Sequence, residues 1–549
     1  MADPTTNSHT LLLSAAALGL ANHAYLHRYE PRTAHYPLLC LLLQPLLLLA
    51  PPFLYTLHSV LATTGVFFTT LALSTALYRL SPWHPLAHVP GPPLAKLSKL
   101  WGVRLQMSGA RHLVLKHLHE RYGDVVRIGP NEVSIATADA VKSVLGSGGL
   151  QKGQYYDVFG DESLGTASLI GLRGDTHAAR RRIWNRGMST ASLRGFESTL
   201  SSRVRGLRDR LDDFAHKETP VDVSQWLMYF TADFMGDMAF GGGFELMRNG
   251  KDVDGTFSVI KMGVKVSSLM AQIPWIVPTV NLLPAVQSVR QFARQSAKRR
   301  MAAGPKGDKD LWYHLMDEEG HEKIKPTVPE VVLDGVLAIV AGSDTSAMTL
   351  STFVWCMLTH PDVYARVQAE VDAVYPDRDG DALFEAERHD DLPFLTASLQ
   401  ETLRLYPPVP TGGARRVPAG PPRVIAGTHF PAGTQVVLPS YVVQRSPAHF
   451  FPGPETFAPA RWLPSGAGAD AGGVVDGAAF LAFSAGAANC AGKRLAWREL
   501  LMAASMLVRR YEMRWAAGLE TEGEAWVDTM HDFYVTHAGR LMVQLRMRA

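Results

Sequence analysis

Residues 481–492 read "LAFSAGAANCAG" and place Cys490 in a stretch of small residues just before a helical pattern. The chain has 549 residues and three cysteines, at positions 40, 356 and 490. A lone cysteine can be a small buried hydrophobe, half of a disulfide, a nucleophile or a metal ligand. Three cysteines cannot build a disulfide framework and indicate a reducing compartment. The rest of the chain must decide the role of Cys490.

The strongest helical pattern of the chain runs from residue 328 to residue 359. Thr327 and Glu330 form a capping-box pair at its start, and a His-Pro pair ends it. Its middle reads "AGSDTSAMT", with a glycine and several hydroxyl side chains where burial is expected to be deepest. Such residues compete with the helix backbone and predict a local bend or opening. Alternatively, Gly342 allows close helix packing and Asp344 forms a structural ion pair.

A second helix is predicted in "FLTASLQETLRLYPPVP", where two consecutive prolines stop it. Glu401 and Arg404 lie one turn apart on it and can pair through two hydrogen bonds. Taken alone, such a pair is usually a surface ion pair of little energetic value. The segment "FAPARW" at 457–462 follows, and then the stretch around Cys490.

Strand patterns are confined to two regions. "GDVVRIGPNEVSIAT" alternates apolar residues about a Gly-Pro turn and predicts a two-stranded hairpin, and residues 424–443 form a second β-rich region. Most of what lies between is helical by its period. Residues 464–479 are rich in glycine and alanine and predict a mobile surface loop. We therefore expect a mainly α protein with small β-sheets, of the α+β class.

The order of these motifs resembles that of the haem-thiolate monooxygenases, the cytochrome P-450 superfamily. The long helix with "AGSDTS", then "ETLR", "FAPARW" and "FSAGAANCAG" carry the resemblance, which covers the chain from about residue 90 to its end. The resemblance implies the cytochrome P-450 fold. It also implies that Cys490 is the thiolate ligand of the iron of haem b (iron protoporphyrin IX). Phe483 would pack against the ring, while Gly486 and Gly492 would let the backbone approach it.

Further matches imply further roles. His177 and Arg181 lie four residues apart on a helix and resemble the pair that binds a haem propionate. Arg415 resembles another propionate partner at a strand end, with neighbouring Arg416 a near-equal candidate. A structural triad that locks the haem-binding loop would consist of Glu401, Arg404 and Arg461.

On the oxygen side of the ring, four residues of the long helix match. Ala341 and Gly342 would face the haem and leave room for dioxygen. Thr345 would hydrogen-bond the bound oxygen, and Asp344 would relay protons from solvent.

Two positions depart from the family pattern. Ala488 stands two residues before the cysteine, where an arginine or histidine commonly contacts a propionate. The absence of that cationic side chain removes a charge-assisted hydrogen bond, which is worth about 1.5–3 kcal/mol when the contact is buried. Haem retention would then depend on His177, Arg181 and Arg415. Ala460 replaces a usual glutamate, but Arg461 beside it is kept.

The first 80 residues differ in composition from the rest. Apolar runs cover residues 11–24, 37–57 and 60–77, and the third is long enough to span a bilayer. No small-residue cleavage site follows the first run, which favours an uncleaved anchor over a signal peptide. We expect a membrane anchor of three transmembrane helices in residues 1–80, a Pro-rich linker in 81–98 and a haem-thiolate monooxygenase domain in 99–549. The alternative is a single anchor with apolar segments lying on the membrane.

Charge predicts the orientation of this anchor. The first ten residues have no Lys or Arg, whereas Arg28 and Arg32 follow the first run and Arg79 follows the third. The positive-inside rule then places the N-terminus in the lumen and the catalytic domain in the cytosol. We expect a multi-pass protein of the endoplasmic reticulum membrane.

Composition and resemblance together predict the function. The chain is 47% hydrophobic and 19% charged, and a net charge of +3 is too small to indicate nucleic-acid binding. The resemblance implies a fungal monooxygenase of secondary metabolism that hydroxylates or epoxidises its substrate. The candidate segments for lining the substrate space are 155–170, 272–283, 409–413 and 531–536. Because they are mostly apolar, we expect a hydrophobic substrate, such as a terpenoid or an alkylated aromatic. Because no flavin or nicotinamide fingerprint is present, an NADPH–cytochrome P-450 reductase is the expected partner, and Lys493, Arg494 and Arg498 offer it a basic face. The alternatives are a haem-thiolate isomerase or dehydratase that needs no reductase, and a non-catalytic haem- or lipid-binding membrane protein.

Overall fold

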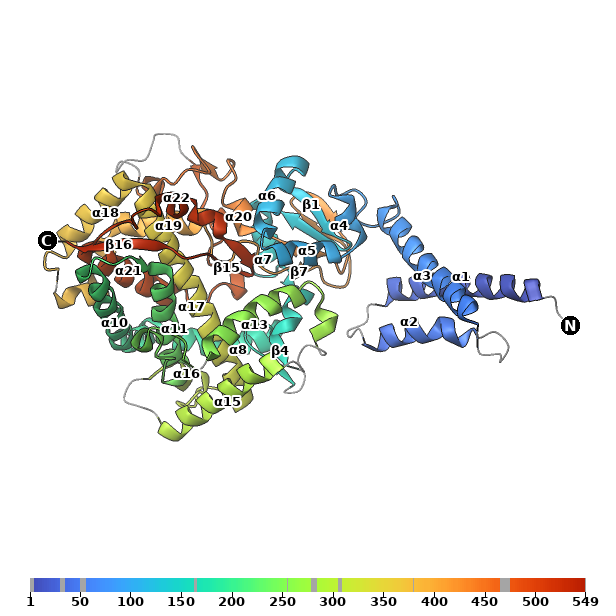
Figure 1. Ribbon diagram of the computed structural model, residues 1–549, viewed down its shortest axis with the longest axis horizontal. Coiled ribbons are helices and arrows are strands. Elements are labelled where there is room, and N and C mark those ends of the chain that lie inside the picture. The colour runs from blue at the N-terminus through green and yellow to red at the C-terminus, as the bar shows by residue number, and fades with distance from the viewer. Residues whose placement is uncertain are drawn as a thin grey trace.

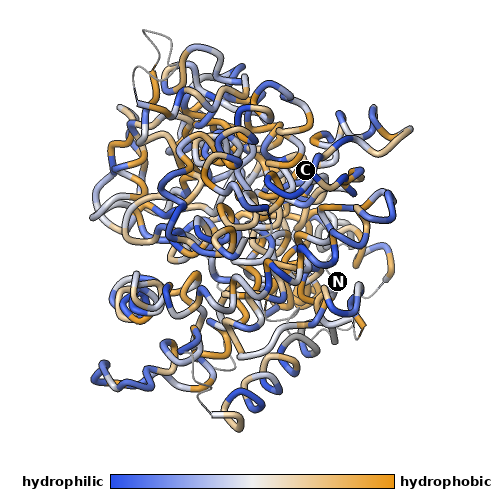
Figure 2. The backbone as a smooth tube through the Cα atoms, turned by 90° about the vertical axis from the view of Figure 1, so that its left-hand side faces the viewer, coloured by the Kyte–Doolittle hydropathy of each residue, from blue (hydrophilic) through white to orange (hydrophobic). Residues whose placement is uncertain are grey.

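The computed structural model describes residues 4–29, 35–49, 56–161, 165–253, 255–277, 284–304, 309–378, 380–464 and 474–548. A mainly helical body carries three N-terminal helices that project from one end of it (Figure 1). These are α1 (Pro4–Arg28), α2 (His35–Leu47) and α3 (Leu57–Leu80). Apolar stretches run through the interior of the body, with the more hydrophilic loops toward its edge (Figure 2).

Helices make up most of the body, as the sequence predicts. They are α4 (Pro93–Leu97), α5 (Leu100–Ser108), α6 (Arg111–Tyr122), α7 (Asp139–Leu145), α8 (Gly174–Gly187), α9 (Thr190–Gly195), α10 (Glu197–His216), α11 (Val223–Phe240), α12 (Leu246–Asn249), α13 (Thr256–Met270), α15 (Pro284–Ala303), α16 (Leu311–Leu315), α17 (Val328–Thr359), α18 (Pro361–Val374), α19 (Pro393–Leu405), α20 (Ser440–Val443), α21 (Lys493–Arg510) and α22 (Glu520–Glu524).

Helix α17 crosses the centre of the body and has the bounds that the sequence predicts. The predicted capping box is confirmed, because the backbone N–H of Thr327 donates to a Glu330 carboxylate oxygen at 2.8 Å. Most side chains in its second half are buried, and it packs against α11, which is itself almost wholly buried. Apolar residues on all sides of both helices are typical of helices inside a large core.

The main sheet lies at the end of the body nearest the N-terminal helices (Figure 1). Its strand order is β1-β2-β10-β7-β3, with β1 and β2 antiparallel and β10 parallel to β2. The predicted hairpin is thereby confirmed. The strands are β1 (Val125–Gly129), β2 (Glu132–Ile135), β3 (Gln151–Lys152), β7 (Arg415–Arg416) and β10 (Gln435–Val437).

Short antiparallel ladders complete the fold. Among the described residues, four of them are two-stranded and pair β4 (Gly160–Asp161) with β5 (Thr166–Ala167), β8 (Arg423–Ile425) with β9 (Thr428–Phe430), β11 (Phe450–Phe451) with β12 (Val474–Val475) and β14 (His531–Phe533) with β15 (Val535–His537). A three-stranded sheet has β16 (Met542–Met547) between β13 (Tyr511–Trp515) and β6 (Val221–Asp222).

Two local predictions need correction. The β-rich region 424–443 ends in the short helix α20, because Pro439 ends the strand pattern and begins this turn. The tract 464–479 was expected to be a mobile loop. Its residues 465–473 lie outside the described ranges, but Val474 and Val475 form strand β12.

The proline-rich segment before the body is packed against the main sheet. The backbone N–H of Arg127 donates to the Pro90 carbonyl at 2.7 Å, and a Cβ at Gly91 would lie 2.2 Å from the Arg127 carbonyl oxygen. Residues 93–97 of this segment form helix α4.

Candidate active site

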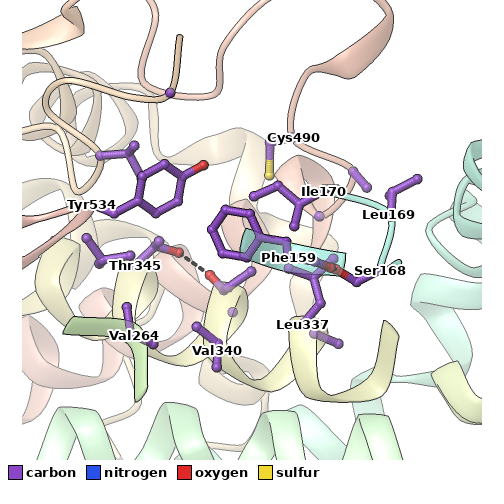
Figure 3. Close-up of a pocket in the computed structure, with 18 of the residues that line it drawn as sticks. Phe159, Ser168, Leu169, Ile170, Val264, Leu337, Val340, Thr345, Cys490 and Tyr534 are labelled. Atoms are coloured by element: carbon purple, nitrogen blue, oxygen red, sulfur yellow. Dashed lines mark hydrogen bonds between the residues drawn. The ribbon is translucent and has the colours of Figure 1, made fainter. Parts of the chain in front are cut away.

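A cavity of about 650 Å³ lies between α17 and the loop that carries Cys490. In Figure 3 the sulfur of Cys490 points into it, and Phe159 and Val340 of α17 also line it. Most of the wall is apolar. This cavity is large enough for a flat cofactor or an apolar small molecule.

The loop before Cys490 has a fixed backbone. Gly486 adopts φ +71°, and a Cβ there would lie 1.8 Å from the carbonyl oxygen of Leu145 at the end of α7. The backbone N–H of Cys490 then donates to the Phe483 carbonyl at 2.9 Å. Gly492 differs from Gly486, because a Cβ on it would have no described residue other than its chain neighbours within 4 Å, and it lines the cavity. The protein itself therefore requires a glycine at 486 and leaves open space beside 492.

The thiol of Cys490 is accessible from the cavity although it lies deep in the protein. Burial raises its pKa, while hydrogen bonds from the backbone of Gly492 and Lys493 and the charges of Arg181 and Lys493 act to lower it. These groups stabilise the thiolate form. Phe483 lies beside the loop with its ring centre 6.1 Å from that of Trp497. The arrangement presents one sulfur, supported by amides, to a large apolar space.

Four cationic or titratable groups line one part of the cavity. His177 and Arg181 come from α8, Arg415 from β7 and Lys152 from β3. The two guanidinium nitrogens of Arg181 that face the loop donate to the carbonyl and side-chain oxygens of Asn489 at 2.5 and 2.6 Å. Arg181 thus holds the residue just before Cys490.

Arg415 has unused hydrogen-bonding capacity. Its side chain is 7% exposed, and its buried Nε has no partner in the described part of the chain. Arg416, the near-equal candidate, is exposed and does not line the cavity. A buried donor without an acceptor is costly, so the site suits an anionic ligand.

Burial lowers the pKa of the other two groups. Burial, with the charges of Lys152 and Arg181, lowers the pKa of His177 to about 4. Burial and nearby arginines lower the pKa of Lys152 to about 7. An anion placed among them would raise both pKa values. Sequence reasoning missed Lys152, since it lies in a two-residue strand without a pattern to mark it.

Of the predicted helix residues, Ala341 and Thr345 line the cavity, and the Thr345 hydroxyl donates to the Ala341 carbonyl at 2.7 Å. The expected opening of the helix is wrong, because α17 continues through this stretch with such hydroxyls bonding back by one turn. Gly342 also borders the cavity, but a Cβ on it would lie 2.5 Å from the sulfur of Met235 in α11. Close packing of two helices therefore requires this glycine.

Asp344 is 3% exposed and does not line the cavity. Burial raises its pKa to about 6, opposed by the charge of Lys261 on α13. A carboxyl group with this pKa exchanges protons readily near neutral pH.

The predicted triad residues meet in one buried network. The Glu401 carboxylate accepts two hydrogen bonds from Arg404, both at 2.8 Å, and one from Arg461 at 3.0 Å. Arg404 also donates to the carbonyls of Gln444, Pro454 and Thr456. Because both members of the first pair are fully buried and their hydrogen bonds are satisfied, the network fixes the segment that leads to the Cys490 loop.

Glu499 is a second residue that sequence reasoning missed. It lies on α21, lines the cavity, and accepts a hydrogen bond from the Ser346 hydroxyl of α17 at 2.6 Å. Its other oxygen has no partner among the described residues, and burial raises its pKa to about 8. The sequence signal that could have identified it is an acidic residue in "LAWRELL" at a helix position where the pattern calls for an apolar residue.

Three of the four segments that the sequence predicts to line a substrate space, 155–170, 409–413 and 531–536, reach the cavity. Phe159 and Ile170 come from the first, Gly413 from the second and Tyr534 from the third. Tyr534 has φ +76°, a strained backbone for an aromatic residue. The fourth segment, 272–283, contributes no lining residue within 272–277, and residues 278–283 lie outside the described ranges.

Comparison with known proteins gives one consistent result. The family model described as cytochrome P450 matches residues 90–522. "Cytochrome P450 67" of Uromyces fabae is 30% identical over 94% of this chain and 96% of its own length. Tryprostatin B 6-hydroxylase of Aspergillus fumigatus is 30% identical over 98% of this chain and 96% of its own. Averantin hydroxylase of Dothistroma septosporum is 30% identical over 89% of this chain and 90% of its own length.

Proposed function

Because the chain belongs to the cytochrome P450 monooxygenase family, we propose that it hydroxylates or epoxidises a hydrophobic small molecule of fungal secondary metabolism. The cavity-facing thiol of Cys490, with hydrogen bonds from two backbone amides and with the charges of Arg181 and Lys493 nearby, is the observation that carries this proposal. A structural cysteine would not need such support.

The residues of the cavity fit a haem. Cys490 would hold the iron, Phe483 would contact the ring, and the open space beside Gly492 leaves room for it. His177, Arg181 and Arg415 would hold the propionates, for which the unpartnered Nε of Arg415 offers a donor. Haem b bound there supplies the dioxygen chemistry that amino-acid side chains lack.

The chain's own residues then handle protons. Thr345 places a hydroxyl at the cavity wall and can turn it from the Ala341 carbonyl into the cavity, where it would hold a proton for the oxygen chemistry. Asp344, one residue earlier and outside the cavity, can take protons from the solvent side and pass them on. The apolar wall keeps bulk water from the reacting atoms.

The wall also limits the substrate. Its aromatic and aliphatic side chains suit a terpenoid or an alkylated aromatic. Glu499 is the one carboxylate among the described lining residues, and it is tied to Ser346. Because burial raises the pKa of Glu499 to about 8, a cationic substrate would find this group largely protonated and uncharged near neutral pH. Two relatives are named for hydroxylating tryprostatin B and averantin.

The reductase and the membrane complete the proposal. Lys493 and Arg494 are exposed at the start of α21, whereas Arg498 is paired with Glu197 at 3.1 Å. We assign the docking of an NADPH–cytochrome P-450 reductase to the exposed pair. The protein would reside in the endoplasmic reticulum membrane with its body in the cytosol.

A carbon monoxide difference spectrum of the reduced protein tests the central assignment. Wild type should show the red-shifted Soret band of a haem thiolate, Cys490→Ser should lose it, and the matched control Cys356→Ser should keep it. A band that survives in Cys490→Ser would exclude Cys490 as the ligand. With reductase present, NADPH consumption linked to a product one oxygen heavier separates a monooxygenase from an isomerase or a binding protein.

A further inference from the structure

Residues 168–170 form part of the cavity wall between strand β5 and helix α8. Ser168, Leu169 and Ile170 all line the cavity near Cys490 (Figure 3). These three residues belong to no strand or helix. Their position therefore depends on contacts from other elements.

Leu169 is held by charged side chains at both of its backbone polar groups. Its N–H donates to Asp334 Oδ1 at 2.8 Å, and its carbonyl accepts from Lys152 Nζ at 2.9 Å. Asp334 comes from α17 and Lys152 from β3, and they are 0% and 9% exposed. Buried, charge-assisted hydrogen bonds of this kind fix a backbone segment strongly.

The Asp334 carboxylate is itself held in place. Its Oδ2 accepts from Trp184 Nε1 and from an Arg180 nitrogen, both at 3.0 Å. The opposite nitrogen of Arg180 lies 2.5 Å from the Glu330 carboxylate. Trp184 and Arg180 belong to α8, so one carboxylate joins α8, α17 and Leu169.

Lys152 has little balancing charge. In the described part of the chain no carboxylate lies within ion-pair distance of its Nζ. Burial, together with the charges of Arg415, Arg173 and Arg181, lowers its pKa, and the charge of Asp334 opposes this only in part. A buried lysine in such surroundings is costly. Among the described residues its Nζ donates one hydrogen bond, to the Leu169 carbonyl, which points to a positioning role.

We propose that Asp334 and Lys152 are positioning residues that fix Leu169 in the cavity wall and so limit the size of ligand that the cavity can hold. The inference rests on the proposed haem-thiolate site, since that site defines the ligand. Freeing Leu169 lets residues 168–170 move outward, which enlarges the space for bulky ligands and leaves small ones unaffected.

Two nitrogen ligands of different size test this in membranes that contain the full-length haem protein. Imidazole and clotrimazole both bind haem iron through a ring nitrogen, and the spectral shift gives a Kd for each without any turnover. Lys152→Met should change the ratio of the two Kd values in favour of clotrimazole by about threefold or more, with the imidazole Kd nearly constant. Asp334→Asn, which leaves one carbonyl oxygen for three donors, should change it in the same direction.

Two further variants serve as controls. Lys152→Arg keeps a charged N–H donor and should retain the wild-type ratio. Glu330→Gln breaks the other ion pair of Arg180, keeps the capping box, and should also retain it. If Asp334→Asn fails to fold, the ratio of the two Kd values in Lys152→Met still tests the proposal.

The proposal is overturned by an unchanged ratio in Lys152→Met, by equal changes for both ligands, or by the same shift in Lys152→Arg. The carbon monoxide band is recorded on each sample. Its absence from wild type would refute the haem-thiolate assignment itself, which is a distinguishable failure.

Discussion

Arg415 and Arg416 show how one residue step changes the function of a side chain. They are alike in sequence, but successive residues of a strand point to opposite faces. Arg415 therefore lies buried at the cavity with an unused Nε donor, and Arg416 is exposed. Sequence alone left the choice between them open, because no pattern fixed the strand's register.

Arg415→Ala should weaken haem retention by about tenfold or more, the value of one or two charge-assisted hydrogen bonds. The physical reason is that Ala488 already removes one propionate contact. The rate at which each protein loses haem to an excess of apomyoglobin, followed by absorbance, measures this retention. Arg416→Ala is the matched control and should behave as wild type. Equal retention in the two variants would show that Arg415 does not hold a propionate.

Thr345→Ala should uncouple electron use from product formation. The variant should bind haem and accept electrons, because neither step uses the hydroxyl, but it should release reduced oxygen as hydrogen peroxide. We expect product per NADPH to fall by about tenfold or more. Ser343→Ala is the control, since its hydroxyl bonds back to Ile339 in the same manner but does not line the cavity. Unchanged coupling in Thr345→Ala would remove this residue from proton delivery.

At the scale of elements, the pairing of α17 with α11 explains the glycine in the middle of α17. The sequence offered two roles for Gly342, room for dioxygen or close helix packing. The contact with Met235 supports packing.

Gly342→Ala should therefore destabilise the protein by about 1–3 kcal/mol through overpacking. In a Met235→Ala background the added methyl group meets open space, so the penalty should vanish or reverse in a double-mutant cycle. Thermal unfolding of the four proteins measures the coupling. If the Gly342→Ala penalty were the same in both backgrounds, the packing role would be wrong.

Elements with strong boundary signals could be predicted from the sequence. The bounds of α17 follow from its capping box and from the His-Pro pair at its end, and the β1–β2 hairpin follows from its Gly-Pro turn. Residues 440–443 could not be predicted, because tertiary contacts decide there. The Ser440 hydroxyl donates to the Val409 carbonyl at 2.7 Å and holds a helical turn where β-branched residues favour a strand.

Within the site, Cys490 and the Glu401 network could be found because several motifs occur in the order that the family resemblance requires, although the Glu401–Arg404 pair alone indicates little. Lys152 and Glu499 were missed, because no motif marks Lys152 and because the partner of Glu499, Ser346, lies on a different helix.

At the scale of the whole molecule, the three N-terminal helices form one packed unit. A Cβ on Gly19 of α1 would lie 2.8 Å from the Phe67 carbonyl of α3, so a small residue permits close contact. Asn22 of α1 donates to Gln44 of α2 at 2.5 Å, which pairs two polar side chains that hydrocarbon would otherwise leave unsatisfied. Both contacts are typical of helices that cross a bilayer together.

Length and hydropathy distinguish these helices. Among the described residues, α3 and the mostly buried α17 are the helices long and apolar enough to span a membrane. Helix α2, with 13 residues, is about 20 Å long, which is short of the hydrocarbon thickness. One span through α3 and three spans through α1–α3 both place the N-terminus in the lumen and the body in the cytosol.

The loop between α1 and α2 decides between the two arrangements. With three spans this loop, near Arg28 and Arg32, is cytosolic, as its positive charges favour. With one span this loop stays on the lumenal side with the N-terminus.

A glycosylation acceptor with flexible spacers, inserted either before residue 4 or in the loop between α1 and α2, reports on which side of the membrane that site lies, because only lumenal acceptors are modified. We expect modification at the N-terminus and none in the loop, with a C-terminal tag open to protease in intact microsomes. Modification at both insertion sites would establish the single span, and protection of the C-terminal tag would contradict the cytosolic body in either arrangement.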